Sequence, residues 1–124
     1  RELEAMRALA ERGGGPRRRA VALLRMARFD LDNARTGEVD ELVPQALASA
    51  RAAGDPKLEI DGLRLEAELA RDRGEPDRGL EACRVALERA GTTRELLSSR
   101  AAILVQKGIL LRRLGRSDEA FEAY

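Results

Sequence analysis

The chain has 124 residues, which is enough for one domain with a core of its own. It contains no His and one Cys, so the composition excludes His-based acid–base catalysis, Cys–His or Ser–His nucleophilic catalysis, and zinc or iron–sulfur sites built from Cys and His. With 23 basic and 22 acidic residues, the net charge of +1 provides no overall field for nucleic acid or a membrane surface.

Helix formers dominate the rest of the composition. Apolar residues are mostly Ala and Leu, and aromatic residues make up only 2%. These proportions favour helices over strands, so we expect an all-α protein. Gly and Pro divide the chain into stretches of helical periodicity without strand alternation. The predicted helices cover about 2–12, 17–35, 40–53, 57–73, 77–90, 94–114 and 117 onward.

Proline marks several of these boundaries. Pro16, Pro56 and Pro76 each follow a Gly or a Gly-x pair, where a proline opens a helix at little cost. Pro44 instead falls inside the clearest apolar stripe of the chain, so its helix either starts late or bends there. That stripe consists of Val39, Leu42, Val43, Ala46, Leu47 and Ala50.

A Gly-x-x-Asp motif recurs at Gly37–Asp40, Gly74–Asp77 and Gly115–Asp118, at Gly-to-Gly spacings of 37 and 41 residues. Gly permits the left-handed turn that ends one helix, and Asp caps the next helix by accepting from its free N–H groups. A helix–turn–helix unit that recurs at this period predicts a solenoid.

The last copy resembles the tetratricopeptide repeat through Leu104, Gly108, Leu111, Gly115, Ala120 and Tyr124. A looser match in the middle copy uses Leu63, Ala67, Ala70, Gly74, Gly79, Cys83 and Ala86. The first copy, Met26, Asp30, Asn33, Gly37, Leu42 and Ala46, departs most, with polar residues where small or apolar ones belong. Repeat units longer than 34 residues are similar to those of MalT-type bacterial regulators.

This resemblance implies an α-α superhelix, a right-handed solenoid of antiparallel helix pairs with about three repeats. The chain then forms one helical-repeat domain over 1–124. Within it, 1–16 holds the end of a preceding helix and a Gly-rich turn. The repeats occupy 17–54, 55–91 and an incomplete 92–124.

In the family, the first helix of each pair lines a concave groove. The resemblance places Leu24, Ala27, Leu31, Arg35, Asp61, Arg64, Glu68, Arg71, Ala102, Val105, Ile109 and Arg112 there. The spacing 61, 64, 68 and 71 independently puts four charges on one helix face. This strip either anchors a peptide or is a solvated face with weak i, i+3 and i, i+4 ion pairs. It lacks the Lys and Asn of chaperone-binding repeats, so chaperone tails are not expected as ligands.

Other local features have simpler explanations. The basic run Pro16–Arg19 either stays hydrated or contacts nucleic acid or an acidic partner, and without aromatic residues between the charges phosphate binding would be weak. Cys83 is expected to pack in the core, with redox sensing as the alternative. Gly13–Gly15 is a flexible connection, because no Gly-Lys-Ser/Thr follows it. No carboxylate pair is positioned for acid–base chemistry, so we expect no enzyme, no cofactor and no metal.

Two functions remain open. The first is a non-catalytic interaction module within a larger bacterial signalling or regulatory protein, which binds another protein or another domain of its own chain. The second is a spacer or self-association element that dimerises through terminal helices carrying Leu9 and Phe121. No nucleic acid or membrane is expected as a partner. A lone cysteine and the absence of a signal peptide or a membrane-spanning run predict the cytoplasm.

The arginine content does not separate these functions. Arg accounts for all but two of the basic residues, the exceptions being Lys57 and Lys107. Either a GC-rich genome explains this bias, or guanidinium groups are needed at an interface.

Overall fold

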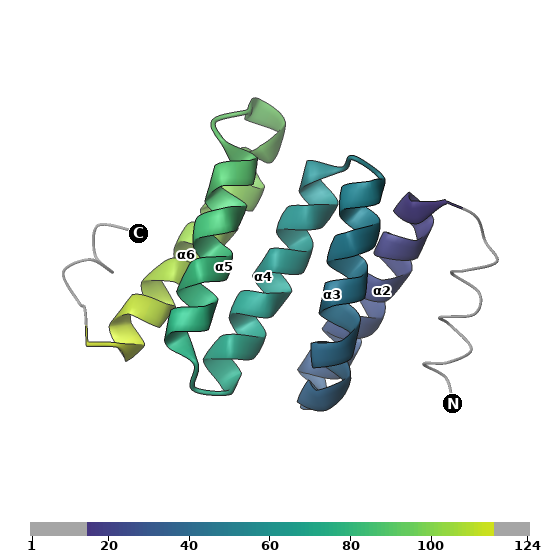
Figure 1. Ribbon diagram of the computed structural model, residues 1–124. Helices are drawn as coiled ribbons and strands as arrows, with labels where there is room; N and C mark the ends of the chain where they lie inside the picture. Colours follow the sequence, from purple (N-terminus) through teal and green to yellow (C-terminus); the bar gives the residue numbers. More distant parts are fainter. Residues whose placement is uncertain (1–14, 116–124) are drawn as a thin grey trace. The chain divides into compact units, whose positions relative to one another are not determined.

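The computed structural model describes residues 15–115, and all regular secondary structure within them is helical. This confirms the all-α fold class. The elements follow one another along the chain as shown in Figure 1. They are α2 (Pro16–Asp32), α3 (Thr36–Ala52), α4 (Pro56–Asp72), α5 (Pro76–Ala90), the 3-10 helix η1 (Arg94–Leu96) and α6 (Leu97–Arg113).

Most predicted boundaries lie within a few residues of the observed ones. Pro16, Pro56 and Pro76 each open a helix, as expected, because the missing proline N–H has no partner in a first helical turn. The stretch predicted as one helix over 94–114 begins as η1 and continues as α6. The helices expected at 2–12 and from 117 lie outside the described residues.

Helix α3 corrects the predicted repeat motif. It begins at Thr36, so Gly37 lies in its first turn rather than in the preceding turn. Asp40 therefore lies inside the helix and does not cap it. The same correction holds for Asp77, which follows Pro76 in the first turn of α5. An aspartate does cap α4, where Asp55 Oδ1 accepts the Leu58 N–H at 3.1 Å.

Pro44 lies eight residues into α3 and the helix continues through it, so the alternative of a late start is wrong. A proline has no N–H to donate to the carbonyl four residues earlier, and its ring crowds that carbonyl. The apolar side chains on either side of Pro44 are buried, including Val39, Leu42, Val43 and Leu47. The free energy gained by burying this apolar face offsets the loss of backbone stability that the proline causes.

Three turns share one left-handed residue, at Ala34 (φ 60°), Gly54 (φ 63°) and Gly74 (φ 70°). In each turn the next residue donates its N–H to the carbonyl five residues back, which is the Schellman helix end. The three bonds are Arg35 N to Asp30 O at 2.7 Å, Asp55 N to Ala50 O at 3.1 Å, and Glu75 N to Ala70 O at 2.8 Å.

These turns change the alignment of the repeat. The residue equivalent to Gly74 in the first copy is Ala34, not Gly37. Ala34 precedes Gly74 by 40 residues, and the left-handed Gly115 follows it by 41. The spacing is thus more regular than the glycine motif predicted. The sequence did not reveal this spacing, because a residue with a Cβ atom, such as Ala34, seldom adopts a positive φ.

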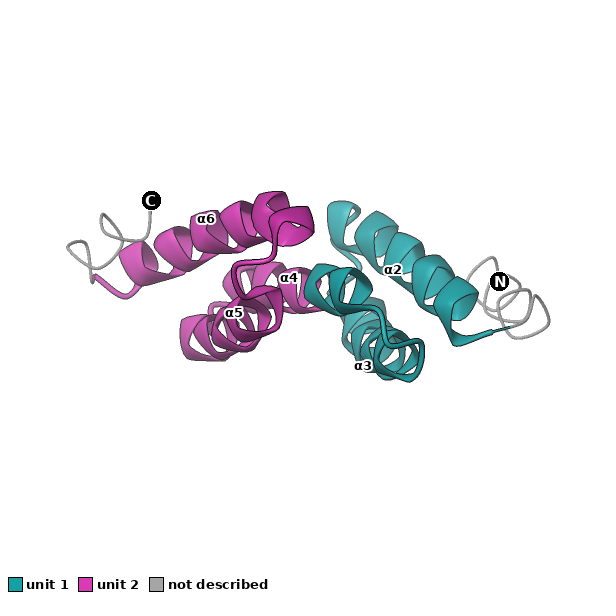
Figure 2. Ribbon diagram, turned by 90° about the horizontal axis from the view of Figure 1, so that it is seen from above, with its two compact units in different colours: residues 1–62 teal, residues 63–124 magenta. Residues whose placement is uncertain are grey.

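The chain divides into two compact units, and their boundary falls within α4 after Gly62 (Figure 2). Unit 1 covers residues 1–62. In it α2 packs along α3, and Leu23, Leu42 and Ile60 are almost fully buried. Gly62 allows α4 to approach closely, because a Cβ atom there would lie 2.8 Å from Leu47 Cδ2.

Unit 2 covers residues 63–124, and in it α5 packs against α6. Its core includes the fully buried Leu69, Cys83 and Ile103. Gly79 has the same role as Gly62, because a Cβ atom there would lie 2.8 Å from Leu110 Cδ1. In each unit, therefore, a leucine side chain packs directly against a helical glycine.

Candidate functional site

Helix α6 exposes an apolar row that the fold of unit 2 leaves uncovered. Leu97 is 51% exposed and Val105 is 49% exposed, and these are two of the three large apolar side chains on the surface of the described chain. Ala101 is exposed between them and Ile109 is half-buried. Residues spaced by four lie on one side of a helix, so Leu97, Ala101, Val105 and Ile109 form a single row, here called the α6 stripe.

The stripe exists because α6 has more apolar residues than one packed face requires. Ile103 and Leu110 turn away from it and are fully buried. An ordinary surface helix has polar residues opposite such a buried face. In α6 that position is occupied by the stripe.

The charges of α6 are all positive. Arg100, Lys107, Arg112 and Arg113 lie on this helix and no Asp or Glu does, whereas each other described α-helix has at least one acidic residue. Arg112 follows Ile109 by three residues, which puts it at the end of the α6 stripe.

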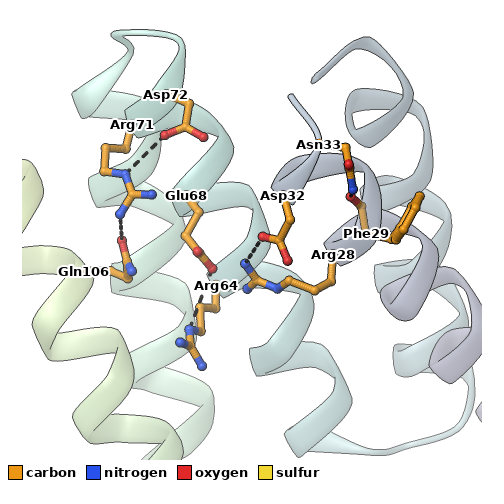
Figure 3. Close-up of polar contacts among 9 residues, drawn as sticks. All are labelled: Arg28, Phe29, Asp32, Asn33, Arg64, Glu68, Arg71, Asp72 and Gln106. Atoms are coloured by element: carbon orange, nitrogen blue, oxygen red, sulfur yellow. Dashed lines mark hydrogen bonds and ion pairs between the residues drawn. The ribbon is translucent and has the colours of Figure 1, made fainter. Parts of the chain in front are cut away.

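The predicted charged strip of α4 is present but mostly paired. Lys57 Nζ lies 3.2 Å from Asp61 Oδ2. Arg64 Nε lies 3.7 Å from Glu68 Oε2, as Figure 3 shows. The Glu68 side chain is only 10% exposed, so this carboxylate offers little surface to a ligand. These pairs also match the alternative of a solvated face with i, i+4 ion pairs.

Arg71 connects this strip to α6. Its Nη1 donates to Gln106 Oε1 at 3.3 Å, and its Nε donates to Asp72 Oδ1 at 3.3 Å (Figure 3). From α6, Arg113 Nη1 donates to the Arg71 carbonyl at 3.4 Å. Unit 2 therefore places the C-terminal end of the α4 strip beside α6.

The positions assigned to the first copy are different. Leu24, Ala27 and Leu31 are buried in unit 1, so they are core residues and do not line a surface. The shifted register accounts only for Ala27 and Arg35: alignment on Ala34 gives Val21, Leu24, Arg28 and Leu31, and Leu24 and Leu31 of this set are buried as well. In the same set, Arg28 is half-buried and pairs with Asp32 at 3.6 Å (Figure 3).

Arg35 lies in the turn between α2 and α3 rather than on α2. Its guanidinium carbon is 5.8 Å from the centre of the Phe29 ring, and its Nη1 is 3.7 Å from Asp30 Oδ1. Phe29 is 54% exposed. Asn33 Nδ2 donates to the Phe29 carbonyl at 2.7 Å and closes the same turn (Figure 3).

Val105 and Ile109 were predicted at the site, whereas their neighbours Leu97, Ala101 and Gln106 were not. A signal was present, because α6 contains apolar residues around most of its circumference. The pattern does not say which apolar face is covered. That depends on the helices packed against it.

Cys83 is fully buried, as expected. Burial removes solvent from the thiolate and raises the pKa of the thiol from 9.0 to about 11, against a small opposing effect of Lys107. A thiol that stays protonated is a poor nucleophile. In the basic run, Arg17 is well exposed and lies 3.5 Å from Asp55.

Among residues 15–115, no three His, Cys, Asp or Glu side chains are grouped to hold a metal ion. Within the same residues, no helix combines the length and the apolar character needed to cross a membrane. No protein-family model, curated protein or solved structure matches the chain.

Proposed function

We propose that this chain is a non-catalytic protein-binding module and that a peptide or helix of a partner binds to the α6 stripe. The observation that supports this most directly is the exposure of Leu97 and Val105 on one side of α6. Exposed apolar rows bordered by charged groups are typical of protein interaction surfaces.

The charged residues beside the stripe supply specificity in this proposal. Arg64 and Arg71 lie on α4 and Arg112 on α6, and Arg71 reaches α6 by donating to Gln106 Oε1 at 3.3 Å. Guanidinium groups recognise carboxylates with defined geometry. Burial of the apolar side chains then provides affinity, and the arginines select the partner.

The tetratricopeptide-like superhelix also belongs to this proposal. Helix pairs with Schellman turns at regular spacing support it, as do the tightly packed glycines Gly62 and Gly79. Small-angle X-ray scattering tests it, since a solenoid has a more elongated profile than a globular chain of this length. Cytoplasmic location and the absence of catalysis remain parts of the same proposal.

A pull-down comparison tests the binding function. The wild-type chain, Val105→Glu and the double variant Arg64→Ala/Arg71→Ala are immobilised and exposed to the same cell extract. Arg25→Glu is the control, because Arg25 is exposed on α2 in unit 1. We expect the wild-type chain and Arg25→Glu to retain the same protein from the extract. Val105→Glu should lose this protein, and the double variant should retain it weakly.

Far-UV circular dichroism confirms that each variant is folded. Equal retention by wild type and Val105→Glu would contradict the proposal. Self-association is the second candidate, because an exposed apolar row also suits another copy of the chain. Light scattering tests it: a dimer that Val105→Glu converts to a monomer would assign the stripe to assembly.

A further inference from the structure

We infer that unit 1 has a binding site of its own, a cavity between the first turn of α2 and the C-terminal part of α3 that takes a small organic phosphate monoester. The start of α2 and the end of α3 lie at the same end of this unit, where the two helices pack along each other (Figure 1). The cavity there has a volume of about 520 Å³. This site goes beyond the proposed function, because it involves no residue of the α6 stripe.

The cavity exists because the residues at its edges are small. Gly15 has no side chain, and a Cβ atom there would meet nothing within 4 Å. On α3, Ala48 and Ala52 line the cavity and are exposed. They are four residues apart and so lie on one side of the helix. One turn further into α2, by contrast, Ala20 is fully buried. The two helices therefore leave a space at this end that their own side chains do not fill.

Ser49 brings a buried polar group to this cavity. The residue lines the cavity although it is only 8% exposed. Among residues 15–115, its hydroxyl has no hydrogen-bond partner. Hydroxyl groups that are buried to this extent normally bond to protein, water or a ligand, because an unsatisfied one is costly. Ser49 therefore offers a hydrogen bond to a molecule that occupies the cavity.

The other polar groups of the lining are mainly hydrogen-bond donors. Arg19 has five N–H groups, more than a single carboxylate can accept, and a guanidinium accepts none. Gln45 Nε2 donates one N–H to the Glu41 carbonyl at 3.1 Å and keeps a second. No Asp or Glu is among the described residues that line the cavity. A lining rich in donors and without a carboxylate suits a ligand rich in acceptors, which is an oxyanion.

The N-terminus of α2 adds to this preference. The helix begins with Pro16, and it has neither a side-chain cap nor an acidic residue in its first turn. The free N–H groups and the positive end of the helix dipole favour an anion at such a position. Arg17 pairs with Asp55 at 3.5 Å and does not line the cavity, so it is not part of the site.

The shape of the site favours a phosphate monoester over other oxyanions. Arg19 and the helix start approach from α2, whereas Ser49 and Gln45 approach from α3. Donors on two sides match the tetrahedral oxygens of a phosphate better than the two coplanar oxygens of a carboxylate. The cavity is also several times larger than a phosphate group. Its alanines and Pro16 provide apolar contacts for an organic group joined to the phosphate.

Phenyl phosphate tests the site in a titration of the wild-type chain followed by two-dimensional amide NMR spectra. We expect the shifts to concentrate in the first turn of α2 and in the C-terminal part of α3, and to saturate at millimolar concentration. Inorganic phosphate should bind at least about tenfold more weakly, because it buries no apolar surface. Benzoate should also bind more weakly, and phenol should not bind. Added salt should weaken the binding of phenyl phosphate, because charges near the surface are screened.

Three variants locate the ligand, each with an expected change in the dissociation constant. Arg19→Gln and Ser49→Ala should each weaken phenyl phosphate binding about tenfold, because each removes a donor to a charged group. Their controls, Arg25→Gln on α2 and Ser98→Ala on α6, change exposed residues of the same types and should have no effect. Ala52→Leu fills the cavity without changing a charge and should abolish binding. Because Ala52 is exposed, this variant keeps the test valid if Arg19→Gln unfolds α2.

The remaining outcomes would overturn the inference in distinct ways. Equal binding of phenol and phenyl phosphate would show that the cavity takes apolar molecules, and equal binding of benzoate would replace the phosphate with a carboxylate. Binding that survives Ala52→Leu would place the anion outside the cavity. Absence of shifts at these amides would show that water alone fills it. None of these results bears on the α6 stripe, which the pull-down tests separately.

Discussion

The turn that follows α2 in unit 1 and the turn that follows α4 in unit 2 have the same backbone form but different residues. Both end a helix in the left-handed region with a short bond to the carbonyl five residues back, from Arg35 in one and Glu75 in the other. Unit 1 uses Ala34 where unit 2 uses Gly74. The comparison shows that helix packing imposes the turn, and that the residue only sets what the turn costs.

The solvent-exposed faces of α2 in unit 1 and of α6 in unit 2 differ more. In unit 1, α2 presents Arg18, Arg25 and Asp32 to solvent, with Phe29 as the large apolar exception. In unit 2, α6 presents the apolar α6 stripe. Helices of equal length therefore leave a mostly charged surface in one unit and an exposed apolar row in the other. Five predictions test this comparison, beginning with the largest effect.

The glycine–leucine contact of unit 2 should be strongly coupled. Leu110→Ala removes a fully buried side chain, and we expect a loss of about 2–5 kcal/mol in the free energy of unfolding. Gly79→Ala alone should cost about 1–3 kcal/mol, because its Cβ overlaps Leu110. In the Leu110→Ala background the same change should be neutral or favourable.

Urea denaturation of the four proteins in this cycle measures the coupling. The matched cycle in unit 1 uses Leu47→Ala and Gly62→Ala. Strict additivity in both cycles would show that the close approach of helix and leucine has no energetic role in either unit.

Pro44 lowers the stability of α3, whereas α5 has no proline beyond its first turn. Pro44→Ala should raise the free energy of unfolding by up to about 3 kcal/mol, because it restores a helical hydrogen bond and removes a clash. Gln45→Ala is the neighbouring control and should change stability little. The midpoint of urea unfolding reports both. An unchanged midpoint for Pro44→Ala would mean that the helix already accommodates the proline.

Cys83, the only cysteine of the chain, gives unit 2 a pH dependence of its stability. The folded chain raises the pKa of this thiol to about 11, so the unfolded chain loses its proton first as the pH passes 9.0. Stability should therefore fall by about 2 kcal/mol between about pH 8 and about pH 10.5. Cys83→Ala should lack this part of the decline in denaturation curves. Parallel pH profiles of the two proteins would contradict the assigned cause.

Two ion pairs contrast a covered carboxylate with an exposed one. In unit 1, Arg51 Nε lies 3.1 Å from Glu59 Oε2, and the Glu59 side chain is only 5% exposed. Arg51→Ala should cost about 1–2 kcal/mol, because a buried carboxylate loses a partner. In unit 2, Arg84 pairs with the exposed Glu81 and Glu88, and Arg84→Ala should leave the thermal midpoint almost unchanged. Equal losses of stability in Arg51→Ala and Arg84→Ala would show that burial of the carboxylate does not determine what the pair contributes.

Substitutions of the two left-handed turn residues should change the stability of the chain in opposite directions. Ala34→Gly removes a strained Cβ and should stabilise the chain by about 1 kcal/mol, whereas Gly74→Ala introduces the strain and should destabilise it by a similar amount. Neither position needs a side chain for packing, since Ala34 is exposed and a Cβ atom at Gly74 would meet nothing within 4 Å. Thermal unfolding measures both. Shifts of the same sign would mean that the left-handed turn does not control these energies.

Much of the fold follows from local sequence alone. Ala- and Leu-rich stretches between Gly and Pro predicted the helices, and the prolines placed the starts of α2, α4 and α5. The repeat register was wrong in its first copy because Ala34 occupies a conformation that its residue type disfavours. This shift explains why Ala27 was wrongly expected on a surface; Leu24 and Leu31 keep their positions in the corrected register and lie in the core because helix packing covers them.

The sequence by itself determined the helices, their order and most of their ends, since these depend on propensity, proline geometry and glycine turns within a few residues of chain. Only the tertiary structure decided which apolar face of α6 is covered, and that Arg71 meets Gln106 thirty-five residues away. Helical periodicity marks a residue as apolar and gives its side of the helix. Whether that side meets a neighbour or solvent depends on distant segments, and this dependence made the α6 stripe a surface.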